Sequence, residues 1–156
     1  MAGIGERAAG FAPAPADVIA RWSAFGRWDR PYFPSHVGLV VEEVRTDYCR
    51  MRLPYRPELE QPAGVVHGGA IATALDTVVV PAVGQRYAPD TRFSTVDFHV
   101  QYLSALVGED GIAEGWVVRR GRTLVFCEAE LVSAGGSVVA RGLLTYHVSP
   151  PPSARS

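Results

Sequence analysis

The spacing of hydrophobic and polar residues changes several times along the chain, and each change marks an expected element. Between Val37 and Tyr55, β-branched and apolar residues alternate with polar ones, which predicts two strands joined by a turn at Thr46-Asp47. Further along, four strand-like runs are separated by turn residues, and they cover 92–103, 111–120, 122–133 and 137–148.

One stretch between these groups of strands has helical periodicity. Ile71, Leu75 and Val78 recur at spacings of four and three residues, and the opposite side of the same helix is apolar as well. A helix that is apolar nearly all round is typical of a buried position. Pro81 lies inside this stretch and is expected to kink the helix or to end its regular part near Val80.

The two ends of the chain differ from this core. Residues 1–15 are rich in Ala, Gly and Pro, and residues 149–156 read SPPPSARS, so both are expected to be flexible tails. A single domain over 16–148 is expected between them. A short helix, capped by Asp17 and extending to about Trp28, should open this domain.

This order of elements predicts an α+β fold, in which an antiparallel sheet of about six strands packs against one long central helix. The 156 residues are enough for one domain with its own core. Such a sheet leaves one face and one edge uncovered, which favours self-association.

Composition narrows the functional classes. A formal net charge of -1 and a pI of about 6.4 offer no basic surface for nucleic acid. We find neither a signal-peptide segment nor an apolar run long enough to cross a bilayer, so a cytoplasmic protein without a membrane partner is expected. Cys49 and Cys127 are isolated from each other and from histidines, so neither a metal site nor a disulfide framework is expected.

Asp76 is the most unusual residue in the pattern. It is the only ionisable residue between Gly68 and Gln85, on a helix that is otherwise apolar. A carboxylate buried without partners is costly, so Asp76 must have hydrogen bonds or a chemical role. The alternative to a chemical role is a structural carboxylate that caps the amides of a neighbouring loop.

His67-Gly68-Gly69 stands at the start of the same helix. Two glycines leave backbone N–H groups unobstructed at the positive end of the helix dipole, where they can polarise a carbonyl, although a plain tight turn is the alternative. Gly68 and Asp76 are eight positions apart, which is about 12 Å along a helix and too far for both to act on one carbonyl. Antiparallel helices in a dimer would instead bring Gly68 of one chain beside Asp76 of the other.

The segment HGGAIATALDT resembles the signature of hotdog-fold acyl-CoA thioesterases of the phenylacetate-pathway type. The resemblance covers roughly residues 32–148. FPSHVGLVVEEV is similar to the first strand of that family, TVDFHVQYLSAL to the strand after the helix, and RRGRTLVFCEAEL to its basic turn and following strand. It implies a single hotdog domain, hydrolysis of an acyl-CoA thioester without a cofactor, and a homodimer or a dimer of dimers.

The resemblance also implies roles for individual residues. Asp76 matches the catalytic carboxylate, as general base or nucleophile, and Gly68 matches the residue whose N–H polarises the thioester oxygen. Gln61 falls where many relatives carry asparagine, which orients water or the thioester. Thr95 matches a Ser/Thr that bonds the attacking water or the carboxylate, but simple alternation puts Thr95 on the opposite face from Phe98.

Further contacts with the substrate are implied around these residues. Gly69 is expected to bind substrate within the glycine pair, and His67 either to contact the thioester or to pin the loop. Three arginines in four positions, Arg119, Arg120 and Arg122, form a basic turn that in similar proteins lies near the nucleotide end of coenzyme A. Guanidinium groups match phosphate geometry, although a solvated hairpin tip is the alternative.

Three other functions are weighed against this one. Hotdog hydratases use a histidine with an acidic partner in a different helix-entry motif, which we do not find in this sequence. A non-catalytic acyl-CoA binder and a thioesterase that acts on acyl carrier protein remain as alternatives.

Overall fold

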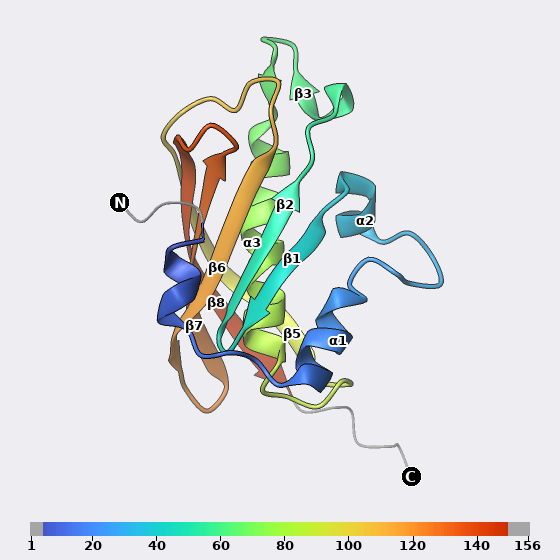
Figure 1. The fold of residues 1–156 in the computed structure, drawn as a ribbon. Coiled ribbons are helices and arrows are strands. Elements are labelled where there is room, and N and C mark those ends of the chain that lie inside the picture. Colours follow the sequence, from blue (N-terminus) through green and yellow to red (C-terminus); the bar gives the residue numbers. More distant parts are fainter. Residues whose placement is uncertain (1–4, 150–156) are drawn as a thin grey trace.

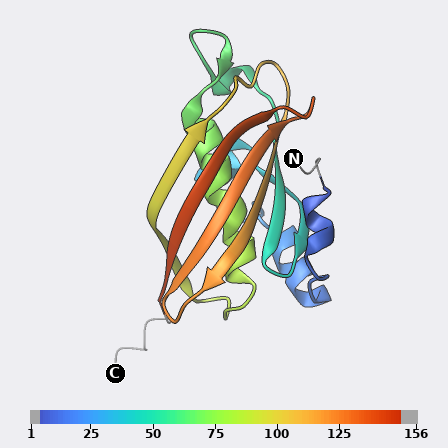
Figure 2. The same ribbon diagram turned by 90° about the vertical axis from the view of Figure 1, so that its left-hand side faces the viewer.

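The computed structural model describes residues 5–149 as an α+β fold built around helix α3 (Gly68–Gly84), shown in Figure 1. A six-stranded antiparallel sheet in the order β1-β2-β6-β7-β8-β5 curves around this helix (Figure 2). The fold class predicted from the sequence is confirmed. The strands are β1 (Val40–Arg45), β2 (Tyr48–Leu53), β5 (Arg92–Tyr102), β6 (Gly111–Arg120), β7 (Leu124–Ser133) and β8 (Val138–Ser149).

Helix α3 is enclosed because the sheet covers most of its circumference. Leu75, Val78 and Val79 are completely buried, as the apolar pattern predicted. Strand β6 approaches the helix closely at Gly115, where a Cβ atom would lie 2.7 Å from side-chain atoms of both valines. Glycine at this position therefore allows the central strand and the helix to pack in direct contact.

Pro81 does not end α3 where the sequence pattern placed its end. Of the two outcomes expected at Pro81, a kink or an end near Val80, the end near Val80 does not occur, because the helix continues to Gly84. Proline removes its own N–H donor to the preceding turn and crowds the carbonyl there, and the helix ends at Gly84, one turn later.

The N-terminal helices differ from the prediction in their bounds. Helix α1 (Ala16–Ser23) begins after Pro15, so Asp17 lies in its first turn and makes no cap, and the helix stops short of Trp28. A second short helix, α2 (Phe33–Val37), follows. Pro34 is compatible with this helix because it lies in the first turn, where backbone N–H groups have no hydrogen-bond partner within the helix.

Of the tail expected over residues 1–15, residues 1–4 lie outside the described residues, and residues 5–15 pack against the domain. They contain the 3-10 helix η1 (Arg7–Gly10), and the Arg7 guanidinium forms ion pairs with the buried carboxylates of Glu114 and Glu130. The ring of Phe11 stacks on Tyr48 at 5.1 Å between centroids. The sequence pattern missed this packing because its partners lie more than 30 positions away. The predicted C-terminal tail lies, apart from its first residue, outside the described residues.

Short elements connect β2 to α3. They are the 3-10 helix η2 (Pro57–Leu59) and a small hairpin of β3 (Glu60–Gln61) and β4 (Val65–Val66). The hairpin places Gln61 beside the start of α3, since both line the same pocket. Within residues 5–149, none of the helices has the length and apolar character needed to cross a membrane.

Candidate active site

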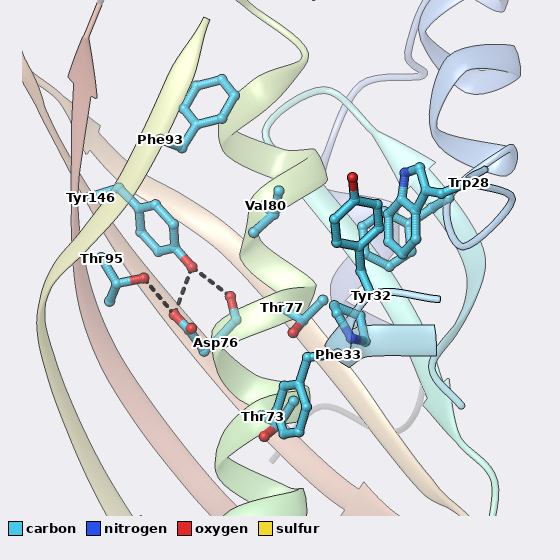
Figure 3. Close-up of a pocket in the computed structure, with 12 residues that line it drawn as sticks. Trp28, Tyr32, Phe33, Thr73, Asp76, Thr77, Val80, Phe93, Thr95 and Tyr146 are labelled. Atoms are coloured by element: carbon cyan, nitrogen blue, oxygen red, sulfur yellow. Dashed lines mark hydrogen bonds between the residues drawn. The ribbon is translucent and has the colours of Figure 1, made fainter. Parts of the chain in front are cut away.

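Asp76 lies midway along α3, and its carboxylate is held by side chains from two neighbouring strands (Figure 3). Thr95 on β5 donates from Oγ1 to Oδ1 of Asp76 at 2.9 Å, and the hydroxyl of Tyr146 on β8 lies 2.6 Å from the same oxygen. No side chain or backbone group of residues 5–149 donates a hydrogen bond to Oδ2. The second carboxylate oxygen is therefore available for chemistry.

Tyr146 remains a hydrogen-bond donor in this arrangement. Burial, followed by the charge and the hydrogen bond of Asp76, raises the pKa of Tyr146 well above its usual value. A phenol that keeps its proton can donate to a carboxylate at neutral pH. The Asp76 carboxylate is thus an acceptor from two protein hydroxyls.

A β-bulge explains how Thr95 reaches the site. Strand β5 pairs Thr95 with Tyr146 and Asp97 with Thr145, so Val96 is an extra residue in the ladder. The bulge reverses the alternation at this point. Thr95 therefore faces α3 together with Phe98, which packs against the core, whereas simple alternation had placed them on opposite faces.

Asp76 opens into a pocket of about 640 Å³ between α3, β5, β8, the connection that follows α1, and the start of α2. Its lining is mostly apolar and rich in aromatic rings. Figure 3 shows Phe93 and Tyr146 on one side of α3 and Trp28 and Tyr32 on the other. The lining residues are Phe25, Trp28, Tyr32, Phe33, Pro34, Thr73, Asp76, Thr77, Val80, Phe93, Thr95 and Tyr146. A pocket of this size and character can hold an acyl chain or an aromatic ring.

Gly68 lies in a different pocket, of about 320 Å³, at the start of α3. The His67 ring accepts a hydrogen bond through Nδ1 from the Gly69 N–H at 2.8 Å and so caps the helix. No acceptor for the Gly68 N–H occurs in the part of the chain that the structure describes. Of the two glycines, Gly68 is therefore the one whose N–H is available to a ligand.

Tyr102 fixes the backbone around this free N–H. Its hydroxyl donates to the Gly68 carbonyl oxygen at 2.9 Å, and its ring lies 3.3 Å from where a Cβ atom on Gly68 would be. Gln61 lines the same pocket, and its Oε1 accepts a hydrogen bond from the Ala63 N–H at 3.2 Å. Tyr102 was not among the candidates from the sequence, because it only continues the apolar alternation of its strand.

The structure thus brings the predicted site residues together in two groups. Gly68, Gln61 and His67 line the pocket at the start of α3, whereas Asp76 and Thr95 line the larger pocket at its middle. The two groups are separated along one helix by the distance that eight residues impose, about 12 Å. Within one chain they do not form a single site.

The three arginines of the basic turn have different surroundings. Arg120 donates to Oδ1 of Asp47 at 2.6 Å and to the Ala82 carbonyl oxygen at 2.7 Å, so it caps the C-terminal end of α3. Arg119 and Arg122 are exposed. Neither pocket described above is lined by any of the three.

Sequence reasoning missed Tyr146 and the aromatic wall of the larger pocket. Tyr146 follows the alternation of β8, in which Leu144, Tyr146 and Val148 all face the core, so its inward direction was readable but its contact with Asp76 was not. The rings of Phe25 and Trp28 pack edge to face at 4.8 Å between centroids. Residues 5–149 contain no cluster of three His, Cys, Asp or Glu side chains suited to a metal ion.

Comparison with known sequences places the chain among thioesterases. Residues 63–140 match the family model of the Thioesterase superfamily. The human protein named acyl-coenzyme A thioesterase 13 is 33% identical over 104 residues, which cover 64% of this chain and 71% of that protein. The mouse protein of the same name is 32% identical over 116 residues, covering 72% and 79%.

Solved structures share the fold. The zebrafish thioesterase superfamily member 2 superposes with a TM-score of 0.73 at 25% identity, over 87% of this chain and 99% of that one. The PaaI protein from the phenylacetic acid degradation operon of Escherichia coli superposes with a TM-score of 0.74 at 14% identity, over 85% and 94%. The hotdog arrangement expected from the sequence is thus confirmed.

Proposed function

Because this chain belongs to the thioesterase superfamily and is a thioester hydrolase, we propose that it hydrolyses acyl-CoA thioesters at a site shared by two copies of the chain. The human and mouse relatives are named as acyl-coenzyme A thioesterases, which supports coenzyme A as the thiol of the substrate. The products are a free acid and coenzyme A, and the reaction consumes one water without a cofactor.

The observation that carries this proposal is the pair of half-sites on α3. One half-site offers a carboxylate oxygen without a protein donor, Oδ2 of Asp76, at the wall of an apolar pocket. The other offers an N–H without a protein acceptor, that of Gly68. Hydrolysis of a thioester needs both a group that acts on the carbonyl carbon and a donor to the carbonyl oxygen.

A two-fold dimer joins the half-sites across subunits. Strand β5 has 11 residues and lies at the end of the sheet, so one side of its backbone has no partner strand among residues 5–149. Pairing of two such edges in antiparallel fashion places the two α3 helices antiparallel as well. Gly68, Gln61 and His67 of one subunit then face Asp76 and Thr95 of the other.

The chemistry follows from this placement. The Gly68 N–H donates to the thioester oxygen and stabilises the negative charge that develops there. Asp76 acts through Oδ2, either by taking a proton from the attacking water or by attacking the carbonyl carbon itself. The tetrahedral intermediate collapses with cleavage of the C–S bond, and the coenzyme A thiolate takes up a proton as it leaves. On the nucleophilic route this collapse leaves a mixed anhydride between Asp76 and the acyl group, which water then hydrolyses. Label found in the Asp76 carboxylate after turnover in ¹⁸O-labelled water identifies this route, because a general base gains no oxygen from the solvent.

The rest of the substrate has two contact areas in this proposal. The acyl group occupies the aromatic-lined pocket beside Asp76. The exposed guanidinium groups of Arg119 and Arg122 contact coenzyme A phosphates. We assign Arg120 to holding the basic turn against Asp47 and α3, since its donors are already used there.

Release of thiol from a panel of acyl-CoA and aryl-acyl-CoA thioesters tests the reaction. The wild-type protein should release coenzyme A from at least one member, and Asp76→Ala should lower kcat about a thousandfold. Asp90→Asn, at an exposed loop position, serves as the charge-matched control and should keep full activity. Activity only on acyl carrier protein thioesters would reassign the donor, and wild type without activity on either series would overturn the proposal.

Coexpression of two inactive variants tests the shared site. Asp76→Ala removes the carboxylate. Gly68→Pro removes the N–H and adds a ring next to Tyr102. The backbone accepts proline there, because proline is tolerated at the first helical position and His67 already has ψ 134, a conformation suited to a following proline. Gly68→Ala, which keeps the N–H, is the control for added bulk next to Tyr102. Purified heterodimers should recover about half the wild-type activity, since one of two sites is intact. A stable monomer at micromolar concentration, or heterodimers without activity, would contradict the shared site.

A further inference from the structure

We infer that Tyr146 is a positioning residue for the reaction, which holds the Asp76 carboxylate so that Oδ2 alone faces the substrate. The inference rests on the proposed function, because it assigns Tyr146 a role through Asp76. It extends that function to a residue on β8, in a part of the chain that the sequence motifs did not single out.

The Tyr146 hydroxyl contacts Asp76 at two atoms. It lies 2.6 Å from Oδ1 and 2.6 Å from the backbone carbonyl oxygen of the same residue. The phenol has one proton, and the charged oxygen is the stronger acceptor. The hydroxyl therefore donates to Oδ1, and this hydrogen bond defines the direction of the carboxylate.

The pairing of β5 with β8 places Tyr146 and Thr95 next to the same oxygen, Oδ1 of Asp76. The two residues are direct partners in the pairing of β8 with β5, and both hydroxyls bond Oδ1. The bulge at Val96 is what turns Thr95 inward beside Tyr146. Two donors on one oxygen hold the carboxylate against rotation, so Oδ1 and Oδ2 do not exchange places.

A fixed carboxylate matters more for the chemical step than for substrate binding. Asp76 must meet the water or the carbonyl carbon at one angle, and a loosely held group loses rate because most of its orientations are unproductive. The acyl group itself packs against apolar and aromatic side chains that Tyr146→Phe leaves in place. Loss of the hydroxyl should therefore lower kcat and leave KM nearly unchanged.

A matched control exists in the same protein. Tyr48 is buried, and its hydroxyl lies 2.6 Å from Oε1 of Glu114, the same distance as in the Tyr146–Asp76 pair. Tyr48 does not line the larger pocket. Tyr48→Phe removes an equivalent hydrogen bond and reports the effect of lost stability alone.

The test measures kcat and KM of both variants on the best acyl-CoA substrate of the wild type. Tyr146→Phe should lower kcat about tenfold, with KM within about twofold of wild type, and Tyr48→Phe should keep the wild-type kcat. Tyr146→Met also lacks the hydroxyl but fills the space differently, so it should show the same loss of kcat. It serves as the readout if the phenylalanine variant does not fold.

A double-mutant cycle with Thr95→Val distinguishes positioning from a general effect on the fold. Both hydroxyls hold one oxygen, so the kcat losses of the single variants should not multiply in the double variant. An unchanged kcat in folded Tyr146→Phe and Tyr146→Met, or an equal loss in Tyr48→Phe, would overturn the inference while leaving the thioesterase activity intact. If Asp76→Ala keeps most of the wild-type activity, the proposed site is wrong. If the wild-type protein releases no thiol from any substrate, the proposed function itself is wrong.

Discussion

Two tyrosine–carboxylate pairs within residues 5–149 lie on opposite faces of the same sheet. Tyr146 on β8 bonds Asp76 of α3 on the inner face, and Tyr48 on β2 bonds Glu114 of β6 on the outer face. Both hydroxyls lie 2.6 Å from a carboxylate oxygen. In both cases burial is the largest cause of a raised tyrosine pKa. As hydrogen bonds, the two pairs are alike.

The surroundings of the pairs differ in cover and in charge. Glu114 is only 4% exposed, and the Arg7 Nε lies 3.7 Å from its second oxygen. The ring of Phe11 covers Tyr48. Asp76 has no ion pair with any residue of 5–149, and it opens into the larger pocket. The outer pair is neutralised and sealed by the N-terminal segment, whereas the inner pair keeps an uncompensated charge beside open space.

This difference separates a structural carboxylate from a reactive one. The desolvation cost of Glu114 is offset by a nearby cation, whereas that of Asp76 is not. A charge sealed with a cation stabilises the packing of the segment that covers it. A charge held by two neutral hydroxyls beside a pocket is less well stabilised and better placed to react. The two pairs should therefore respond in opposite ways to the same kind of substitution.

Neutralising each carboxylate gives the largest expected contrast. Asp76→Asn should lower kcat about a thousandfold while the free energy of unfolding stays the same or rises, since an uncompensated charge is removed. Glu114→Gln should lower the free energy of unfolding by about 2 kcal/mol, because it leaves the Arg7 charge with one carboxylate fewer, and should keep kcat.

Urea denaturation and thiol-release kinetics on the same four preparations measure this contrast. Wild type is the reference for both measurements. Glu128→Gln changes a half-buried glutamate on the outer face of β7, and it should alter neither kcat nor the free energy of unfolding. A loss of kcat in Glu114→Gln comparable to that in Asp76→Asn would break the distinction between the two faces.

The fold was predictable because it depends on local periodicity. Alternation located the long strands to within a few residues, and the all-apolar surface of α3 identified it as the central helix. What failed depended on distant partners. The segment containing Arg7 reads as a tail until Glu114 and Glu130 are brought beneath it, more than 100 positions later in the sequence.

The candidate site was predictable only in part, for a similar reason. Asp76 and Gly68 stand out because each breaks the pattern of its own helix. Tyr146 continues the pattern of its strand and so gives no signal. Its contact with Asp76 depends on the register between β5 and β8, and that register includes a bulge at Val96 that alternation alone does not reveal.

The smallest expected effect concerns what the two pairs share, and it appears at alkaline pH. The pKa of each tyrosine is raised in the folded state, so its contribution to stability is complete below the unfolded value of about 10 and is lost as the pH rises above it. Above that pH each tyrosine should lower the free energy of unfolding by about 1.4 kcal/mol per pH unit.

Urea denaturation between about pH 9 and 11 isolates this effect. Tyr48→Phe and Tyr146→Phe should each flatten the fall in stability by the same amount. Burial raises the pKa of both free thiols, Cys49 and Cys127, and because wild type and both variants contain them, their contribution cancels in the difference. A fall that stays as steep in Tyr146→Phe as in wild type would mean that this hydroxyl ionises freely in the folded protein. Equal flattening, together with a kcat loss in Tyr146→Phe alone, would place the difference between the two pairs in the pocket and not in the hydrogen bond.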